Sequence, residues 1–113
     1  MCNEYLFFME QVSMDDVDSL TISEKSYGDS WKKRGGVGAF MMLARKWDRL
    51  ENQLSKEGYD IFKEILKEGL DKKDGIIDDV RDLRRYLILV ESHLIAVTSK
   101  DSNTQEDGTD ITT

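Results

Sequence analysis

The sequence predicts an all-α protein, a compact bundle of about four helices followed by a disordered acidic C-terminal tail. Two observations support this fold class. The 113 residues include no proline, and apolar residues, which make up 39% of the chain, recur at helical spacing through long charged segments. A chain of this length forms one domain with a modest core.

The first helix is expected to begin at Ser13, because Ser13 and Asp16 have the spacing of a capping box, and to end at Gly28. Residues 1–12 then form an apolar N-terminal extension. Its apolar run, Tyr5 to Met9, is too short to span a bilayer and lacks the basic start of a signal peptide. We expect the extension to cover the core or a seam between subunits, and contact with a membrane is the less favoured alternative.

Three further helices are predicted between glycine-containing turns. The second runs from about Val37 to Lys56 and stops before Gly58, and the third covers about Tyr59 to Glu68. The fourth, about Gly75 to Thr98, is capped by Asp74 in this interpretation. Its segment LILVESHLIAV is apolar on nearly every side, which is typical of a helix that is central or lies in a subunit interface.

The charge and cysteine content narrow the classes of function. The net charge is −7, of which −3 belongs to the polar, non-periodic tail, residues 99–113, so the helical domain, residues 13–98, with the extension carries −4. This balance disfavours a nucleic-acid polymer as the partner, since binding to phosphates favours a basic face. The single cysteine, Cys2, cannot form an internal disulfide, which favours a cytoplasmic location.

Two acidic couplets are the main candidates for a metal site. Asp48 and Glu51 lie on the second helix, and Asp79 and Asp82 lie on the fourth. Residues at i and i+3 share a helix face, so two packed helices could present four carboxylates to Mg²⁺. At about 100° per residue, Glu51 and Asp79 lie about 50°, and Asp48 and Asp82 about 110°, from the centres of the apolar stripes. The couplets therefore border the seam, although most such couplets are only solvated faces.

The connection DSWKKRGGVG is a second candidate site. Lys32 and Arg34 stand beside two glycines just ahead of a helix N-terminus, which suits a phosphate group, although the spacing is not that of a Walker A loop. Tyr27 and Trp31 flank the connection and could stack a base. They could equally fill the core, because positions 17, 20, 24, 27 and 31 share one helical stripe. An exposed turn is the plainer alternative for the connection.

The segments SYGDSWKKRGGVGAFMMLARKWDRLEN and DGIIDDVRDLRRYLIL carry a family resemblance that covers roughly Glu24 to Val90. They resemble small phage and bacterial proteins with a YG-x-x-W stretch, a K-x-x-R-L helix and a later D-x-x-x-D-x-x-x-Y helix. These proteins look related to all-α, MazG-like nucleoside-triphosphate pyrophosphatases and to nucleotide-modification-associated domains of phages. The resemblance implies two acidic pairs that bind Mg²⁺ and cleavage between the α and β phosphates of a nucleotide.

The resemblance also implies roles for individual residues. The metal-binding and catalytic roles fall to Asp48, Glu51, Asp82 and either Asp79 or Asp78, although Asp78 by its angle fits a surface ion pair with Arg85 better. The expected ligand contacts are those of Tyr27, Trp31, Lys46, Arg49 and Tyr86. The superfamily pattern is E-x-x-E followed by E-x-x-D, whereas three of the four positions here are the shorter Asp. The shorter side chains alter the reach to a metal and leave open a pocket that binds a nucleotide without cleaving it.

We therefore expect a nucleotide-binding protein that forms a homo-oligomer, dimeric or higher, without membrane contact. The leading activity is Mg²⁺-dependent pyrophosphohydrolysis, with one acid as the base and Mg²⁺ positioning the water. One alternative is a non-catalytic sponge that sequesters a nucleotide immune signal. Another is an acidic protein inhibitor of a host or defence enzyme. If the chain is encoded by a phage, its location is the cytoplasm of the bacterial host.

Overall fold

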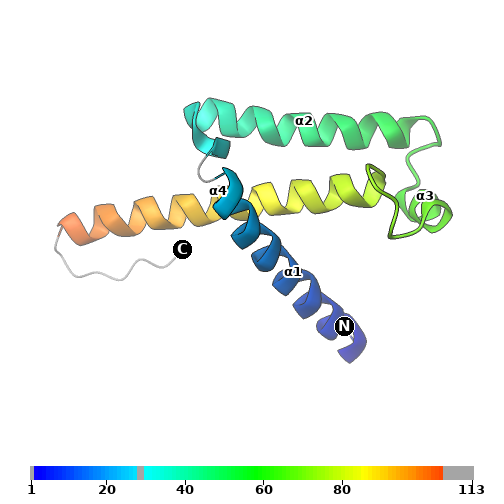
Figure 1. The fold of residues 1–113 in the computed structure, drawn as a ribbon, viewed down its shortest axis with the longest axis horizontal. Helices are drawn as coiled ribbons and strands as arrows, with labels where there is room; N and C mark the ends of the chain where they lie inside the picture. Colours follow the sequence, from blue (N-terminus) through cyan, green and yellow to red (C-terminus); the bar gives the residue numbers. More distant parts are fainter. Residues whose placement is uncertain (1, 28–29, 106–113) are drawn as a thin grey trace.

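The structure is a computed structural model that describes residues 2–27 and 30–105, and the side chains of residues 2–24 and 30–100. The described residues form helices only, which confirms the predicted all-α class (Figure 1). The elements are α1 (Asn3–Tyr27), a short 3-10 helix η1 (Ser30–Lys32), α2 (Gly35–Ser55), α3 (Ile61–Glu68) and α4 (Ile76–Gln105).

The core lies between α2 and α4, which run side by side, at the end where α3 joins them (Figure 1). Leu50 and Leu54 of α2 and Ile76 of α4 are its buried residues. Side chains of α3 and α4 pack against them as partly buried neighbours, namely Ile61, Ile65 and Val80. The predicted stripes of α2 and α4 are therefore correct at this end of the helix pair.

Away from α3 the same stripes reach the surface. Phe40 and Trp47 of α2 are 65% and 53% exposed, and Leu87 of α4 is 50% exposed. The C-terminal end of α4 extends past the other helices (Figure 1), and the last part of the apolar segment, with Leu94, Ile95 and Val97, is exposed and not central. Of the two alternatives for this segment, a subunit interface stays a prediction. None of the described helices is long and apolar enough to cross a membrane.

The course of α1 differs from the prediction. The helix begins at Asn3, so Ser13 lies in its interior and the predicted capping box is wrong. The apolar extension, residues 1–12, supplies helix-forming positions from Asn3 onward and continues directly into the predicted helix. The predicted inward position Val17 is 59% exposed, whereas Asp16 is buried.

The N-terminus of α4 is capped by α3, and not by Asp74 as predicted. The backbone N–H of Ile76 donates to Oε1 of Glu68 at 3.0 Å, which satisfies one of the unpaired donors of the first turn. A Cβ on Gly75 would lie 2.6 Å from the same oxygen, so glycine permits this close approach. At its other end α4 continues past Thr98 to Gln105, and residues 106–113 of the predicted tail lie outside the described residues.

A buried carboxylate joins α1 to α4. Asp16 accepts hydrogen bonds from Nε of Arg84 at 2.6 Å, from Nη2 of Arg84 at 2.8 Å and from Nε of Arg85 at 2.8 Å. The hydrogen bond from Arg84 is the largest influence on the pKa of Asp16. Together with the bond from Arg85 it holds the pKa below its ordinary value, against the opposing effect of burial.

Asp16→Asn is expected to destabilise the fold by about 1.5 to 3 kcal/mol at pH 7, because it removes charge-assisted hydrogen bonds. The lowered pKa means that this contribution is complete above the unfolded-state pKa of about 3.9 and disappears as pH falls through the folded-state value. Thermal unfolding of both proteins from pH 7 to pH 2 measures the difference. Asp18→Asn, an exposed position on the same helix, is the control, and a difference that does not change with pH would contradict this assignment.

Candidate functional site

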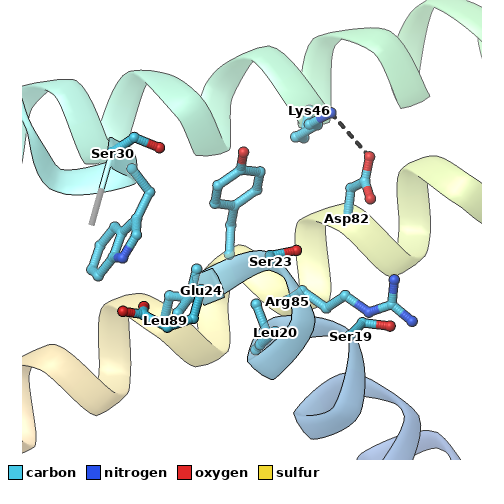
Figure 2. Close-up of a pocket in the computed structure, with 11 residues that line it drawn as sticks. Ser19, Leu20, Ser23, Glu24, Ser30, Lys46, Asp82, Arg85 and Leu89 are labelled. Atoms are coloured by element: carbon cyan, nitrogen blue, oxygen red, sulfur yellow. Dashed lines mark hydrogen bonds and ion pairs between the residues drawn. The ribbon is translucent and has the colours of Figure 1, made fainter. Parts of the chain in front are cut away.

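A cavity of about 360 Å³ lies between α1, η1, α2 and α4 (Figure 2). Its volume is at the lower end of the range found for small-molecule sites, about 300 to 1,000 Å³. Polar, charged and aromatic side chains line it: Ser19, Leu20, Ser23, Glu24, Ser30, Trp31, Lys46, Asp82, Arg85, Tyr86 and Leu89.

The ion cluster around Asp16 positions the α1 wall of this cavity. Residues three, four and seven positions after a helical residue share its face, so burying Asp16 against α4 also turns Ser19, Leu20 and Ser23 toward α4. These residues all line the cavity. Arg85, which holds Asp16, is itself part of the cavity wall, so the same side chain fixes α1 and faces the site.

Two aromatic rings give the cavity an apolar surface suited to a planar ligand. Trp31 belongs to η1 and is half-buried, and Tyr86 belongs to α4. His93, one turn after Leu89 on α4, makes an edge-to-face contact with the indole, with ring centroids 5.8 Å apart. Trp31 thus lines the candidate cavity, and stacking of a base on its ring stays a prediction.

The cationic groups of the cavity already have carboxylate partners. Lys46 of α2 pairs with Asp82 of α4 at 3.0 Å, and Figure 2 shows this ion pair crossing between the two helices. The ammonium group also lies 6.0 Å from the centroid of the Tyr86 ring. Arg85 uses Nε for its bond to Asp16, which leaves its Nη groups as further donors. A ligand anion must therefore share these cations with carboxylates.

Asp79 lies behind the cavity wall, buried between α2 and α4 at 1% exposure. Its Oδ2 accepts a hydrogen bond from Gln53, and its Oδ1, 3.2 Å from Nε of Arg49, has no hydrogen-bond partner of good geometry. Desolvation is the largest influence and raises the pKa of this carboxyl, while the positive charges of Arg49 and Lys46 oppose the rise. The charged form of Asp79 therefore lowers the free energy of unfolding.

Asp79→Asn is expected to raise the melting temperature at pH 7 by a few degrees, because the amide keeps the shape of the side chain without a buried charge. The pKa of Asp79 is higher in the folded state than in the unfolded state. The cost of the buried charge therefore appears as pH rises through the unfolded-state pKa, about 3.9, and is complete above the folded-state pKa. The gain should therefore vanish in acid. Thermal melts across this range test it, with the exposed Asp48→Asn as control, and a destabilised Asp79→Asn protein at pH 7 would show that the Arg49 pair outweighs desolvation.

The two acidic couplets do not come together as expected. Asp48 and Glu51 are exposed on α2, whereas Asp79 is buried against Gln53 and Asp82 is paired with Lys46. Within the residues that the structure describes, no group of three or more His, Cys, Asp or Glu side chains is placed to hold a metal ion. The carboxylates of the two couplets are therefore not gathered into the set of oxygen ligands at short range that Mg²⁺ needs.

The other predicted residues divide between the cavity and the surface. Trp31, Lys46 and Tyr86 line the cavity, where the ligand contacts that the resemblance implies stay a prediction, and Arg49 pairs with buried Asp79. Lys32 lies 5.9 Å from the Trp31 ring and so borders the site. Elsewhere, Asp78 pairs with Arg81 at 3.8 Å and not with Arg85, Arg34 is exposed at the start of α2, and the side chain of Tyr27 lies outside the described residues.

The α1 residues of the cavity were not predicted, and neither was Arg85. The predicted helix begins at Ser13 and has Val17 facing the core. In that orientation Asp16, Ser19 and Ser23 face away from the core. A usable signal exists, because a helix from Asn3 places Tyr5, Met9 and Val12 on the same face as Asp16 and Ser23.

No protein family, no characterised protein and no solved structure matches this chain. The interpretation of the site therefore rests on its geometry and chemistry.

Proposed function

We propose that this protein binds a nucleotide in the cavity between α1, η1, α2 and α4 and retains it without hydrolysis. The observation that carries the proposal is the combination in one mononucleotide-sized cavity of two aromatic rings, Trp31 and Tyr86, with two cationic groups, Lys46 and Arg85. A base needs a flat apolar surface and a phosphate needs positive donors; here the rings come from η1 and α4 and the cations from α2 and α4.

In the proposed complex the phosphate lies between Lys46 and Arg85. The ammonium group has three donors, of which one contacts Asp82, and the Nη groups of Arg85 supply a planar pair. The hydroxyls of Ser19 and Ser23 add neutral donors from α1. Asp82 remains bonded to Lys46 beside the ligand. Its negative charge therefore repels a triphosphate more strongly than a phosphate group with fewer charges.

The base and sugar occupy the aromatic end of the cavity. Trp31 offers the larger stacking surface, and its contact with His93 holds the indole in one orientation. Glu24 of α1 also lines the cavity. Its carboxylate can accept a hydrogen bond from a ribose hydroxyl or from an exocyclic amine of a base.

The placement of the carboxylates supports retention over hydrolysis. Pyrophosphohydrolysis, which the MazG-like resemblance implies, depends on acidic pairs gathered around Mg²⁺. Here Asp48 and Glu51 are exposed, and Asp79 and Asp82 have protein partners. This arrangement favours the interpretation of the chain as a nucleotide sponge over that of an enzyme.

Nucleotide binding is expected to change the fluorescence of Trp31. The chain has two tryptophans, so the measurement uses a Trp47→Phe background, in which Trp31 is the only one. In that background Lys46→Met should weaken the affinity about 10- to 100-fold, the equivalent of one lost charge-assisted hydrogen bond. Titration with a panel of ribo- and deoxyribonucleoside mono- and triphosphates measures both effects.

Lys63→Met is the matched control, because Lys63 is an exposed lysine on α3 outside the cavity wall, and its affinity should equal that of the parent. Absence of any affinity across the panel, or equal losses in the Lys46 and Lys63 variants, would contradict the proposed site.

A bound nucleotide is expected to be recovered unchanged after incubation with Mg²⁺ or Mn²⁺. Chromatography of the nucleotide pool, with an assay for released pyrophosphate, detects cleavage. Formation of monophosphate and pyrophosphate in proportion to protein concentration would overturn retention. If such turnover were seen, its loss in Asp82→Asn with intact helicity would assign it to this chain and not to a contaminant.

A further inference from the structure

The N-terminal half of α1 has an apolar face that the rest of the chain does not cover. α1 contacts α4 where Asp16 meets Arg84, and from there it runs away from the other helices toward its N-terminus (Figure 1). Tyr5, Phe8 and Val12 continue the face that Asp16 buries, yet all three are exposed. We call the exposed half of the helix, residues 3–15, the α1 overhang.

An isolated helix of this length is marginal in water, because nucleation is costly and an apolar face needs a partner. The overhang exposes a nearly continuous set of large apolar side chains, Tyr5, Leu6, Phe7, Phe8, Met9, Val12 and Met14. Exposed apolar surface of this extent marks a contact site for another molecule.

Charge indicates what kind of surface covers the overhang. The α1 overhang contains three acidic residues, Glu4, Glu10 and Asp15, and no lysine or arginine. Like charges disfavour packing of one overhang against another, and they also disfavour an anionic membrane, which attracts basic helices. The complementary surface is therefore both apolar and basic.

The chain carries such a surface at the start of α2. Val37, Phe40 and Met41 are exposed there and lie within one and a half turns of the helix. Around them stand exposed basic residues, Lys33, Arg34 and Arg45. We call these six residues the α2 basic surface.

We propose that the α1 overhang of one copy packs on the α2 basic surface of a second copy. The contact joins two different surfaces, so two copies complete it by exchanging overhangs, which satisfies both overhangs in a closed two-fold dimer. Apolar burial of Phe8 and its neighbours supplies the affinity, and the opposite charges fix the partner and the register.

The test uses three forms of the full chain: wild type, Phe8→Asp on the overhang and Phe40→Asp on the α2 basic surface. Light scattering after gel filtration should give the wild type about twice the 13.1 kDa of one chain, and each variant the mass of one chain. An equimolar mixture of the two variants should regain the double mass. In the mixed dimer one contact is wild type on both sides, and both substitutions fall in the other contact.

Circular dichroism establishes that each variant keeps its helices, which is expected because Phe8 and Phe40 are exposed. High salt should weaken the wild-type dimer, since the contact joins unlike charges. A monomeric wild type, variants that keep the double mass, or a mixture that stays monomeric would each overturn the proposal. So would binding of the wild type to lipid vesicles that is lost in Phe8→Asp and kept in Phe40→Asp.

The dimer and the nucleotide site are tested separately. Neither Phe8 nor Phe40 lines the cavity, and the mass measurement needs no nucleotide. Failure of nucleotide binding therefore leaves the dimer proposal standing, and a monomeric protein leaves the cavity proposal standing.

Discussion

The arrangement of α1 depends on one buried carboxylate. Asp16 is 1% exposed and is held by two neighbouring guanidinium groups on α4, Arg84 and Arg85. The cluster sets the rotation of α1, because only one face of the helix can present Asp16 to α4. That rotation in turn places Ser19 and Ser23 in the cavity wall. Tyr5 to Val12 stay exposed because the N-terminal half of α1 runs away from the other helices (Figure 1). A charged contact thus organises both candidate surfaces of the molecule.

The apolar core has a smaller and more local role. Leu50, Leu54 and Ile76 hold α2, α3 and α4 together at one end, and the cavity lies toward the other end of the α2 and α4 pair. There the helices are joined by polar contacts, notably the pair between Lys46 and Asp82. Polar groups that hold helices together can exchange a protein partner for a ligand, which close-packed apolar side chains cannot do. The division between an apolar end and a polar end is the physical basis of the proposed binding site.

The acidic couplets illustrate how a helix face can mislead. On each helix the i, i+3 spacing was sound, but the α2 couplet lies on the outer surface and the α4 couplet is occupied by Gln53, Arg49 and Lys46. A carboxylate near a helix seam can be a ligand for a metal or a partner for a neighbouring cation. In this chain Asp79 and Asp82 are partners for cations, because Lys and Arg are abundant on α2 and α4. Of the four couplet residues, Asp79 destabilises the fold when it is charged, because burial raises its pKa.

The all-α class, the ranges of α2 and α3 and the core around Leu50 and Ile76 could be predicted from the sequence. Trp31, Lys46 and Tyr86 could be named from it as ligand candidates. These features follow from the spacing of neighbouring residues along one helix, or from the short motifs that carried the family resemblance. Which helix faces pack together depends on contacts between residues far apart in the sequence, and the sequence pattern does not show these contacts. Asp16 and Arg84 lie 68 positions apart, so nothing local shows that they pair, and an error in the start of α1 rotated its whole face. The cavity is shared by four elements, and its α1 wall exists only after that long-range ion cluster has formed.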